Sequence, residues 1–224
     1  MTGAVTAAGG AAVDPTTAAV ARAGLVAVLR APTAERFRTI SEVLVEAGVT
    51  VVEVTLTSTG AVPALAALAR DLPDEVVVGA GTVLTVDQAE ACVQAGARFL
   101  VSPVTVPEIT TYALAAGVPA YPGALTPTEV FTASRGGAAA VKLFPASAVG
   151  PRYLRDLRGP LPEVRIIPTG GIALTDIGDW LGAGALAVGL GGPLVGDAGR
   201  GGSLSALADR ARRAVAAVHA ARSS

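Results

Sequence analysis

The chain has 224 residues, of which 51% are hydrophobic, and carries a formal net charge of −1. It has no basic cluster that could follow a phosphate backbone, so no nucleic-acid partner is expected. Gly, Pro or charged residues interrupt the longest apolar runs well before the ~20 residues that a membrane-spanning helix needs, so no membrane partner is expected either. This length fits one large α/β domain.

The N-terminal segment carries no Lys or Arg before Arg22, and therefore lacks the cationic start of a secretory signal. We expect residues 1–13 to form a short flexible tail and residues 14–224 to form a single domain. Cys92 is the only cysteine, so no intramolecular disulfide can form and the expected location is the reducing cytoplasm. Its amphipathic surroundings predict a small buried thiol.

Short strands rich in Val, Ile and Leu alternate with Ala-rich helices along the chain. The expected strands cover residues 24–30, 50–56, 75–81, 98–103, 118–123, 139–144, 164–170 and 185–191. The expected helices cover residues 33–47, 61–70, 86–95, 106–116, 126–135, 151–158, 174–182 and 203–222. Helix starts carry the expected N-caps Thr33, Thr85 and Thr126, and helix ends carry Gly48, Gly96 and Gly117.

Eight β–α units with no change in composition predict one closed (β/α)8 barrel, the TIM barrel. The alternative is an open doubly wound sheet, which commonly has five or six strands and a Gly-x-Gly-x-x-Gly motif after the first of them. No such motif follows residues 24–30. The barrel is therefore favoured, and its functional site is expected at the carboxyl ends of the strands.

Lys142 is the only lysine of the chain, beside 16 arginines, and it lies in the apolar run AAAVKLFPAS. An arginine can supply positive charge, but it cannot lose its proton and become an amine nucleophile. Desolvation inside the barrel disfavours the ammonium form, and a neutral amine can attack a ketone to form a Schiff base without a cofactor. The alternative role is a structural ion pair, which an arginine would serve equally well.

Glu53 is the only carboxylate within a predicted strand core. If Lys142 points inward, Ala140 and Phe144 do so as well, because side chains alternate along a strand. Strands 2 and 6 contribute to the same layer of a barrel, so Glu53 and Lys142 are expected to face each other. An interior glutamate suits proton transfer, and a pairing role with Lys142 or Arg30 is the alternative.

Two glycine-rich segments, IIPTGGI and VGLGGP, end strands 7 and 8. Barrels frequently hold phosphate at the loops after these strands, although glycine also serves tight turns. His219 is the only histidine, and one His with one Cys cannot form a Cys/His zinc site. No metal or other cofactor is expected.

Several motifs together resemble one known family: AVLR, VVEVTLTS, VGAGTVLT, FLVSPV, PAYPGALTPTEV, AVKLFPAS and IPTGGI. They occur in family order over roughly residues 24–192. The set is similar to bacterial pyruvate-dependent class I aldolases that cleave 2-keto-3-deoxy-6-phosphogluconate, 2-keto-3-deoxy-6-phosphogalactonate and 4-hydroxy-2-oxoglutarate. The run VKLFPASAVGPRYLRDL particularly resembles the phosphogalactonate branch.

The resemblance implies a homotrimer in which Lys142 forms the Schiff base with pyruvate and Glu53 moves protons. It also implies a set of substrate-binding residues at the strand ends. Arg30 would supply a cation, Thr82 and Pro103 would line the pyruvate pocket with Phe144 and Thr169 beside them, and phosphate would lie against Gly170, Gly171, Gly191 and Gly192.

Two positions depart from the family pattern. Thr57 stands where the phosphogluconate branch often has an arginine, which leaves open whether Arg30 contacts a carboxylate or a phosphate. Gly191 and Gly192 stand in a loop that often offers a serine hydroxyl to phosphate. Backbone amides would then have to hold the phosphate.

The expected function is reversible cleavage of a 2-keto-3-deoxy-6-phospho sugar acid to pyruvate and glyceraldehyde 3-phosphate. One alternative keeps the Schiff base but uses unphosphorylated 4-hydroxy-2-oxoglutarate, which yields pyruvate and glyoxylate. A second alternative is a phosphometabolite-binding barrel without turnover. The sequence leaves open the configuration of the sugar acid, the pathway and the oligomeric state.

Overall fold

The computed structural model describes residues 13–223. Its strands are β1 (Leu25–Leu29), β2 (Val51–Thr55), β3 (Val77–Gly81), β4 (Leu100–Val101), β5 (Ala120–Tyr121), β6 (Gly123–Ala124), β7 (Val141–Leu143), β8 (Ile166–Pro168) and β9 (Val188–Leu190). Its α-helices are α1 (Pro15–Ala23), α2 (Phe37–Glu46), α3 (Ala61–Asp71), α4 (Val86–Gln94), α5 (Pro107–Ala115), α6 (Pro127–Arg135), α7 (Pro151–Arg158), α8 (Ile177–Gly182), α9 (Gly192–Val195) and α10 (Leu204–Arg222). Three 3-10 turns complete the set: η1 (Ala146–Ala148), η2 (Leu174–Asp176) and η3 (Ala198–Arg200).

The strands form two parallel sheets, so the prediction of one closed eight-stranded TIM barrel is wrong. One sheet has six strands in the order β5-β4-β3-β2-β1-β9, and the other has three in the order β6-β7-β8. Between β8 and β9 the described residues form a single isolated bridge, from Thr169 to Gly189. The architecture is therefore a curled six-stranded half-barrel with a small second sheet beside it.

Two prolines lie where the hydrogen-bonded pairing between the two sheets is interrupted, and they account for the separation of the sheets. Pro122 lies between β5 and β6, which the sequence pattern had predicted as one strand over residues 118–123. Pro168 ends β8 next to β9. Because proline has no backbone N–H, it cannot donate to a ladder, and the regular pairing stops at these two places.

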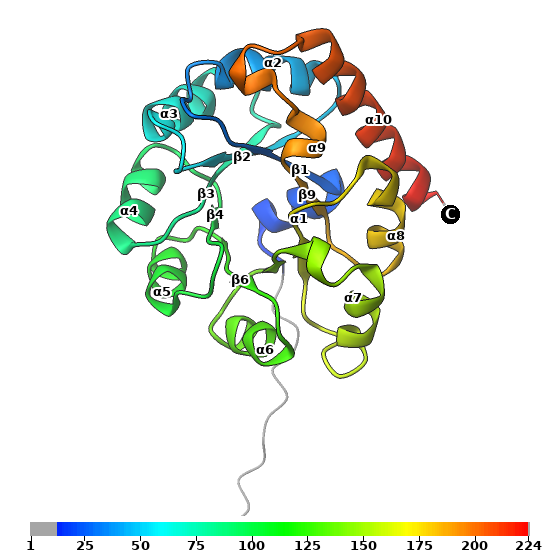
Figure 1. Ribbon diagram of the computed structural model, residues 1–224. Coiled ribbons are helices and arrows are strands. Elements are labelled where there is room, and N and C mark those ends of the chain that lie inside the picture. The colour runs from blue at the N-terminus through cyan, green and yellow to red at the C-terminus, as the bar shows by residue number, and fades with distance from the viewer. Residues whose placement is uncertain (1–12, 224) are drawn as a thin grey trace, which may run out of the picture.

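Both sheets nevertheless face one apolar interior, as parallel sheets do when helices cover their other face. We call its members the inner cluster: Val20, Val26, Val28, Val51, Val77, Phe99, Val101, Tyr121, Ala140, Ile167 and Ala187. Helices α2 to α8 and α10 lie outside the strands and pack on their other face (Figure 1). The larger apolar core lies between these two layers.

Alternation along β2 and β7 confirms the predicted side-chain directions. Val51 and Ala140 belong to the inner cluster, whereas Val52 and Val141 pack with the helices in the outer core. The strand register agrees with this. Glu53 of β2 is paired with Val28 of β1, which belongs to the inner cluster, so both side chains lie on the inner face of the sheet. Side chains two residues apart on a strand share a face, so Glu53 points inward.

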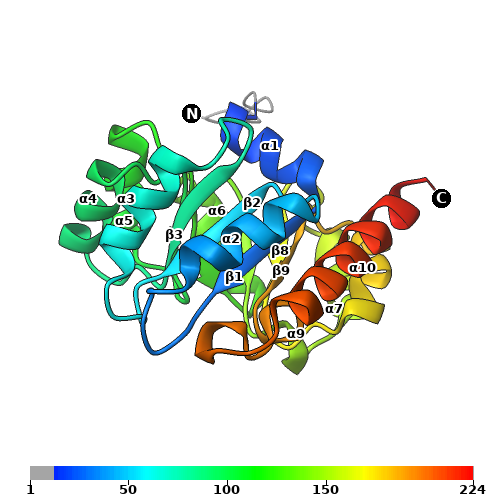
Figure 2. The same cartoon turned by 90° about the horizontal axis from the view of Figure 1, so that it is seen from above.

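Helix α1 was not predicted from the sequence pattern, although its start carries clear signals. The Asp14 carboxylate accepts from the backbone N–H of Thr17 at 2.8 Å, and Pro15 occupies the first helical position. The helix buries Val20 in the inner cluster, and the hydroxyls of Thr17 and Tyr121 lie 2.9 Å apart. Figure 2 shows α1 and α9 at opposite ends of the strands.

Most of the other predicted helix boundaries agree with the structure. Thr85 and Thr126 cap α4 and α6 as expected, and α6 also has a capping box with Glu129. Thr33 does not cap a helix, because α2 begins four residues later, after Arg36. The tail predicted for residues 1–13 lies outside the described residues, apart from Val13.

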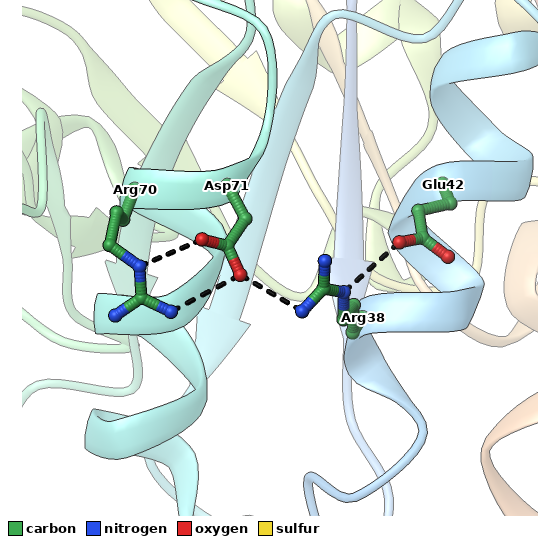
Figure 3. A network of polar contacts seen from close by, with 4 residues as sticks. All are labelled: Arg38, Glu42, Arg70 and Asp71. Carbon is green, nitrogen blue, oxygen red and sulfur yellow. Dashed lines mark hydrogen bonds and ion pairs between the residues drawn. The ribbon is translucent and has the colours of Figure 1, made fainter.

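An ion-pair network joins α2 to α3 on the outer surface (Figure 3). Asp71 accepts a hydrogen bond from Arg70 at 2.8 Å and forms an ion pair with Arg38 at 3.0 Å. Arg38 also donates to Glu42, one turn further along α2, at 3.1 Å. Hydrogen bonding from Arg70 lowers the pKa of the Asp71 carboxyl. These helices cover β1 and β2; Arg30 follows β1, and Glu53 lies in β2.

Candidate active site

Lys142 and Glu53 face each other in the interior, as predicted. Nζ of Lys142 lies 3.6 Å from Oε1 of Glu53, and the two side chains are only 6% and 4% exposed. Strand β7 positions the lysine and β2 the glutamate, from different sheets. Removing two ionisable groups from water costs free energy, which their mutual attraction does not always repay. Because such groups are common at functional sites, Lys142 and Glu53 are candidate catalytic residues.

The hydrogen bonding of this pair is incomplete. Oε1 of Glu53 is buried and has no hydrogen-bond partner within the described residues, and its separation from Nζ exceeds ordinary hydrogen-bond length. Nζ also lies 5.4 Å from the ring centroid of Phe144, where the aromatic face attracts a cation. A carboxylate oxygen with spare acceptor capacity, beside an amine, can accept or return a proton.

A cavity of about 170 Å³ opens above Lys142 at the carboxyl ends of β1, β7, β8 and β9. Its walls contain Val28, Arg30, Lys142, Phe144, Thr169, Gly170, Gly171, Gly191, Gly192 and Pro193. Eight of the predicted site residues therefore line one space. Glu53 lies below them, beside a much smaller internal void of about 10 Å³ that Lys142 and Thr169 also line.

Arg30 and Thr82 meet at the edge of this cavity. Nη2 of Arg30 donates to the Thr82 hydroxyl at a long 3.4 Å, and Arg30 is exposed. Thr82 has a φ of 59°, and it is the only non-glycine residue with positive φ in the described part of the chain. Such a backbone conformation is unfavourable for a β-branched residue and is common at functional sites.

Pro103, like Glu53 and Thr82, is a predicted site residue that does not line the main cavity. It lines a neighbouring cavity of about 290 Å³ together with Thr105, Gly123 and Phe144. The Phe144 ring belongs to the walls of both spaces. Pro103 therefore lies next to the candidate site rather than within its described cavity.

Backbone conformation explains the two central glycines. Gly170 and Gly171 have φ of +97° and +73°, the left-handed region that other residues rarely adopt. A Cβ on Gly170 would lie 3.0 Å from the Phe144 ring, and one on Gly171 would lie 2.6 Å from Cβ of Ser147. The TGG run thus lets the loop turn while its backbone forms the cavity wall.

Sequence reasoning did not predict that two glycines, Gly81 and Gly189, make room for side chains of the candidate site. A Cβ on Gly81 would lie 2.0 Å from Oε1 of Glu53, and a Cβ on Gly189 would lie 2.2 Å from the Thr169 hydroxyl. Both glycines lie inside predicted strands. Glycine within a strand commonly marks a close approach, and that signal could have found them.

Other reactive groups are scarce in residues 13–223. No group of three or more His, Cys, Asp or Glu residues in this range could hold a metal ion. Cys92 is buried in the outer core, as predicted, and burial raises the pKa of its thiol to about 11. No helix of the described chain is long and apolar enough to cross a membrane.

A buried lysine and a buried glutamate below a glycine-rich cavity define a site suited to carbonyl chemistry through an amine. The family described as KDPG and KHG aldolase matches residues 17–202, and the chain belongs to this family. It is an enzyme, a lyase of the aldolase type.

Three similar proteins support this placement. The 2-dehydro-3-deoxy-6-phosphogalactonate aldolase of Escherichia coli is 34% identical over 171 residues, which cover 76% of this chain and 83% of the relative. A solved structure described as native KDPGal has a TM-score of 0.84 and 32% identity, and the match covers 89% of this chain and 96% of the other. A KDPG aldolase from Legionella pneumophila, with pyruvate captured as a covalent carbinolamine intermediate, has a TM-score of 0.82 and 30% identity over 89% of this chain and 97% of the other.

Proposed function

We propose that the enzyme reversibly cleaves a 2-keto-3-deoxy-6-phospho sugar acid to pyruvate and glyceraldehyde 3-phosphate through a Schiff base on Lys142. One observation carries the proposal: the only lysine of the chain lies 3.6 Å from a buried glutamate and also lines the cavity. A structural ion pair would not require the lysine to reach a cavity. The pyruvate carbinolamine of the Legionella relative supports the same chemistry.

The mechanism follows from the two side chains. The neutral Lys142 amine attacks the C2 ketone of the substrate, and loss of water from the carbinolamine forms the imine. Glu53 takes a proton from the C4 hydroxyl, directly or through a water, while the C3–C4 bond breaks. The imine accepts the electron pair as an enamine, and the aldehyde leaves. Protonation of the enamine carbon and hydrolysis of the imine then release pyruvate and the free amine.

The upper walls of the cavity suit the anionic parts of such a substrate. Arg30 supplies a positive charge, and the backbone of Gly170, Gly171, Gly191 and Gly192 can approach a phosphate closely because no side chains intervene. Thr82, Thr169 and Phe144 are proposed to contact the keto acid beside Lys142, with Pro103 flanking them across the Phe144 ring. A galactonate-type substrate is favoured by the absence of an arginine at Thr57 and by the similarity to the E. coli enzyme.

Reductive trapping tests the proposal. Incubation with pyruvate and sodium borohydride should attach reduced pyruvate to the peptide that contains Lys142, and only one lysine ε-amine exists in the chain. Intact-mass measurement and peptide mapping separate this product from modification of the N-terminus. A folded protein that forms no adduct, and that turns over none of the three candidate sugar or keto acids, would overturn the proposal in favour of a binding role.

Specificity constants decide the substrate. The proposal expects a higher kcat/KM for a six-carbon phosphorylated substrate than for 4-hydroxy-2-oxoglutarate, because the cation of Arg30 and the glycine loops line the cavity and can hold a distal anion. The reverse order would favour the unphosphorylated alternative and keep the Schiff base. Comparing the gluconate and galactonate epimers then identifies the preferred configuration.

We further propose a homotrimer located in the cytoplasm. The family resemblance carries the trimer, and large exposed apolar residues on neighbouring elements are consistent with an interface: Leu84, Val86, Val104, Leu114 and Phe131. The lone reduced cysteine agrees with the cytoplasm. Light scattering on the purified chain tests the trimer directly.

A further inference from the structure

The backbone on both sides of Arg30 is held by buried hydroxyls from the β2 end. The Thr55 hydroxyl donates to the carbonyl of Leu29 at 2.9 Å, just before Arg30. The Ser58 hydroxyl accepts from the backbone N–H of Ala31 at 3.1 Å, just after it. Thr55 is 0% exposed and Ser58 is 2% exposed, so water does not compete for either contact. The two hydroxyls therefore clamp a three-residue segment with Arg30 at its centre.

Backbone pairing extends the clamp beyond these side chains. The N–H of Thr59 donates to the carbonyl of Pro32 at 3.0 Å, and the N–H of Ala34 donates to the carbonyl of Thr59 at 2.9 Å. The first half of the loop after β1 is thus fixed to the loop after β2. Within it, the side chain of Arg30 is exposed and lines the cavity.

The charge of Arg30 is left available by this arrangement. No ion pair in residues 13–223 includes Arg30, and its one side-chain hydrogen bond goes to the neutral hydroxyl of Thr82 at 3.4 Å. A long, flexible side chain loses considerable rotamer freedom when it binds. Fixing the backbone in advance lowers the entropy that remains to be lost.

We propose that Ser58 and Thr55 are positioning residues that hold Arg30 over the cavity for the anionic group of the substrate, its phosphate or its carboxylate. The inference rests on the proposed aldolase function. Neither hydroxyl touches the substrate; both act through the backbone of Leu29 and Ala31. Loss of either should weaken binding of the anion while the amine chemistry at Lys142 continues.

Two variants test the clamp, and two others serve as controls. Ser58→Ala and Thr55→Val remove the hydroxyls with little change in volume. Thr55→Ser restores the donor, and Ser41→Ala removes an equally buried hydroxyl that has no hydrogen-bond partner among residues 13–223. Steady-state kinetics on the phosphorylated sugar acid should show KM raised about tenfold for Ser58→Ala and Thr55→Val, the effect expected from losing one hydrogen bond. Their kcat should stay within about twofold of the wild-type value, because the lost interaction stabilises the bound substrate and the transition state equally.

The controls separate positioning from a structural role. Thr55→Ser should return KM close to the wild-type value, and Ser41→Ala should leave it unchanged. A clamp residue that served only stability would lower the melting temperature without changing KM of the folded protein. If Ser58→Ala does not fold, the Thr55→Val and Thr55→Ser pair gives the same measurement.

Two further readouts identify the anion. If Arg30 serves the phosphate, the variants should weaken competitive inhibition by inorganic phosphate and leave the pyruvate concentration needed for borohydride trapping unchanged. If it serves the carboxylate, that pyruvate concentration should rise instead. If the wild-type protein forms the pyruvate adduct but both folded variants keep the wild-type KM, the inference is overturned while the proposed function stands. Absence of the adduct in wild-type protein would be a failure of the proposed function itself.

Discussion

Glu53 and Gly81 share one space, because the Glu53 carboxylate fills the position that a side chain on Gly81 would occupy. A Cβ added to Gly81 would lie 2.0 Å from Oε1 of Glu53, and residues 53 to 55 of β2 pair with residues 79 to 81 of β3. The direction of the catalytic carboxylate in the proposed mechanism therefore depends on the absence of a side chain on the neighbouring strand.

Gly81→Ala should displace Glu53 and impair both activity and stability. Overpacking of a filled interior destabilises by about 1–3 kcal/mol, and displacing the carboxylate should reduce kcat. Thermal unfolding and kinetics measure the two effects. Gly182→Ala is the matched control, because a Cβ there has no neighbour within 4 Å and the position lies in α8. Wild-type behaviour of Gly81→Ala would show that Glu53 has room to move.

Lys142→Arg should abolish turnover and pyruvate trapping while the charge is kept. Arginine supplies the cation but has no free amine, so a Schiff base cannot form. Kinetics and borohydride trapping check this, with circular dichroism to establish that the variant is folded. An arginine variant that turns over at the wild-type rate would rule out the nucleophile.

Glu53→Gln should lower kcat about 10²-fold, the smallest effect usually found for loss of a general acid–base. The amide keeps the shape of the side chain but cannot take up a proton at the reacting hydroxyl. The comparison is with Glu42→Gln, since Glu42 is exposed and pairs with Arg38 on the surface. Equal rates for both variants and wild type would leave Glu53 without a role in catalysis.

Thr17→Val should destabilise the protein by about 1 kcal/mol, the usual net contribution of a hydrogen bond. It removes the contact that joins α1 to Tyr121, and the Tyr121 ring lies against Phe99 at a centroid distance of 5.4 Å. Denaturant unfolding of Thr17→Val, Tyr121→Phe and the double variant forms a cycle. Strictly additive effects would show that the two hydroxyls do not interact.

The capping box of α6 should make stability depend on pH. Backbone N–H groups of Thr126 and Leu125 donate to the Glu129 carboxylate and lower its pKa. A carboxyl whose pKa is lowered by folding stabilises the protein above its unfolded pKa, and this stabilisation is lost as pH falls through the folded pKa. Wild type should therefore be more stable than Glu129→Gln at neutral pH, and the difference should shrink in acid. A constant difference across that range would contradict the assignment.

Local pattern predicted most of the elements and the central pair of the site. The alternation of side-chain directions along AAVKLF and TVVEVTL depends only on neighbouring residues. It therefore predicted which residues of β7 and β2 face inward, and the structure agrees at Val51, Ala140 and Val141. Thr85 and Thr126 cap their helices because capping involves only neighbouring residues. Thr33 failed as a cap because contacts of Thr59 with Pro32 and Ala34 hold that loop outside a helix.

The closure of the sheet, by contrast, was predicted wrongly. Eight repeats suggested an unbroken ring, but Pro122 divides one expected strand and Pro168 stops the ladder beside β9. Each proline is visible in the sequence, yet its consequence depends on which strand becomes its neighbour. Helix α1 was missed for a related reason, since its stability comes from packing Val20 into the inner cluster.

The sequence by itself determined the strand and helix pattern, the solitary lysine, and the parity that directs Lys142 and Glu53 to the same interior. These properties depend on residue type and on periods of a few residues. Only the tertiary structure decided that Gly81 leaves room for Glu53, that Ser58 and Thr55 hold the backbone around Arg30, and that the strands form two sheets. Those relationships join segments tens of residues apart, and the packing of side chains in three dimensions sets them.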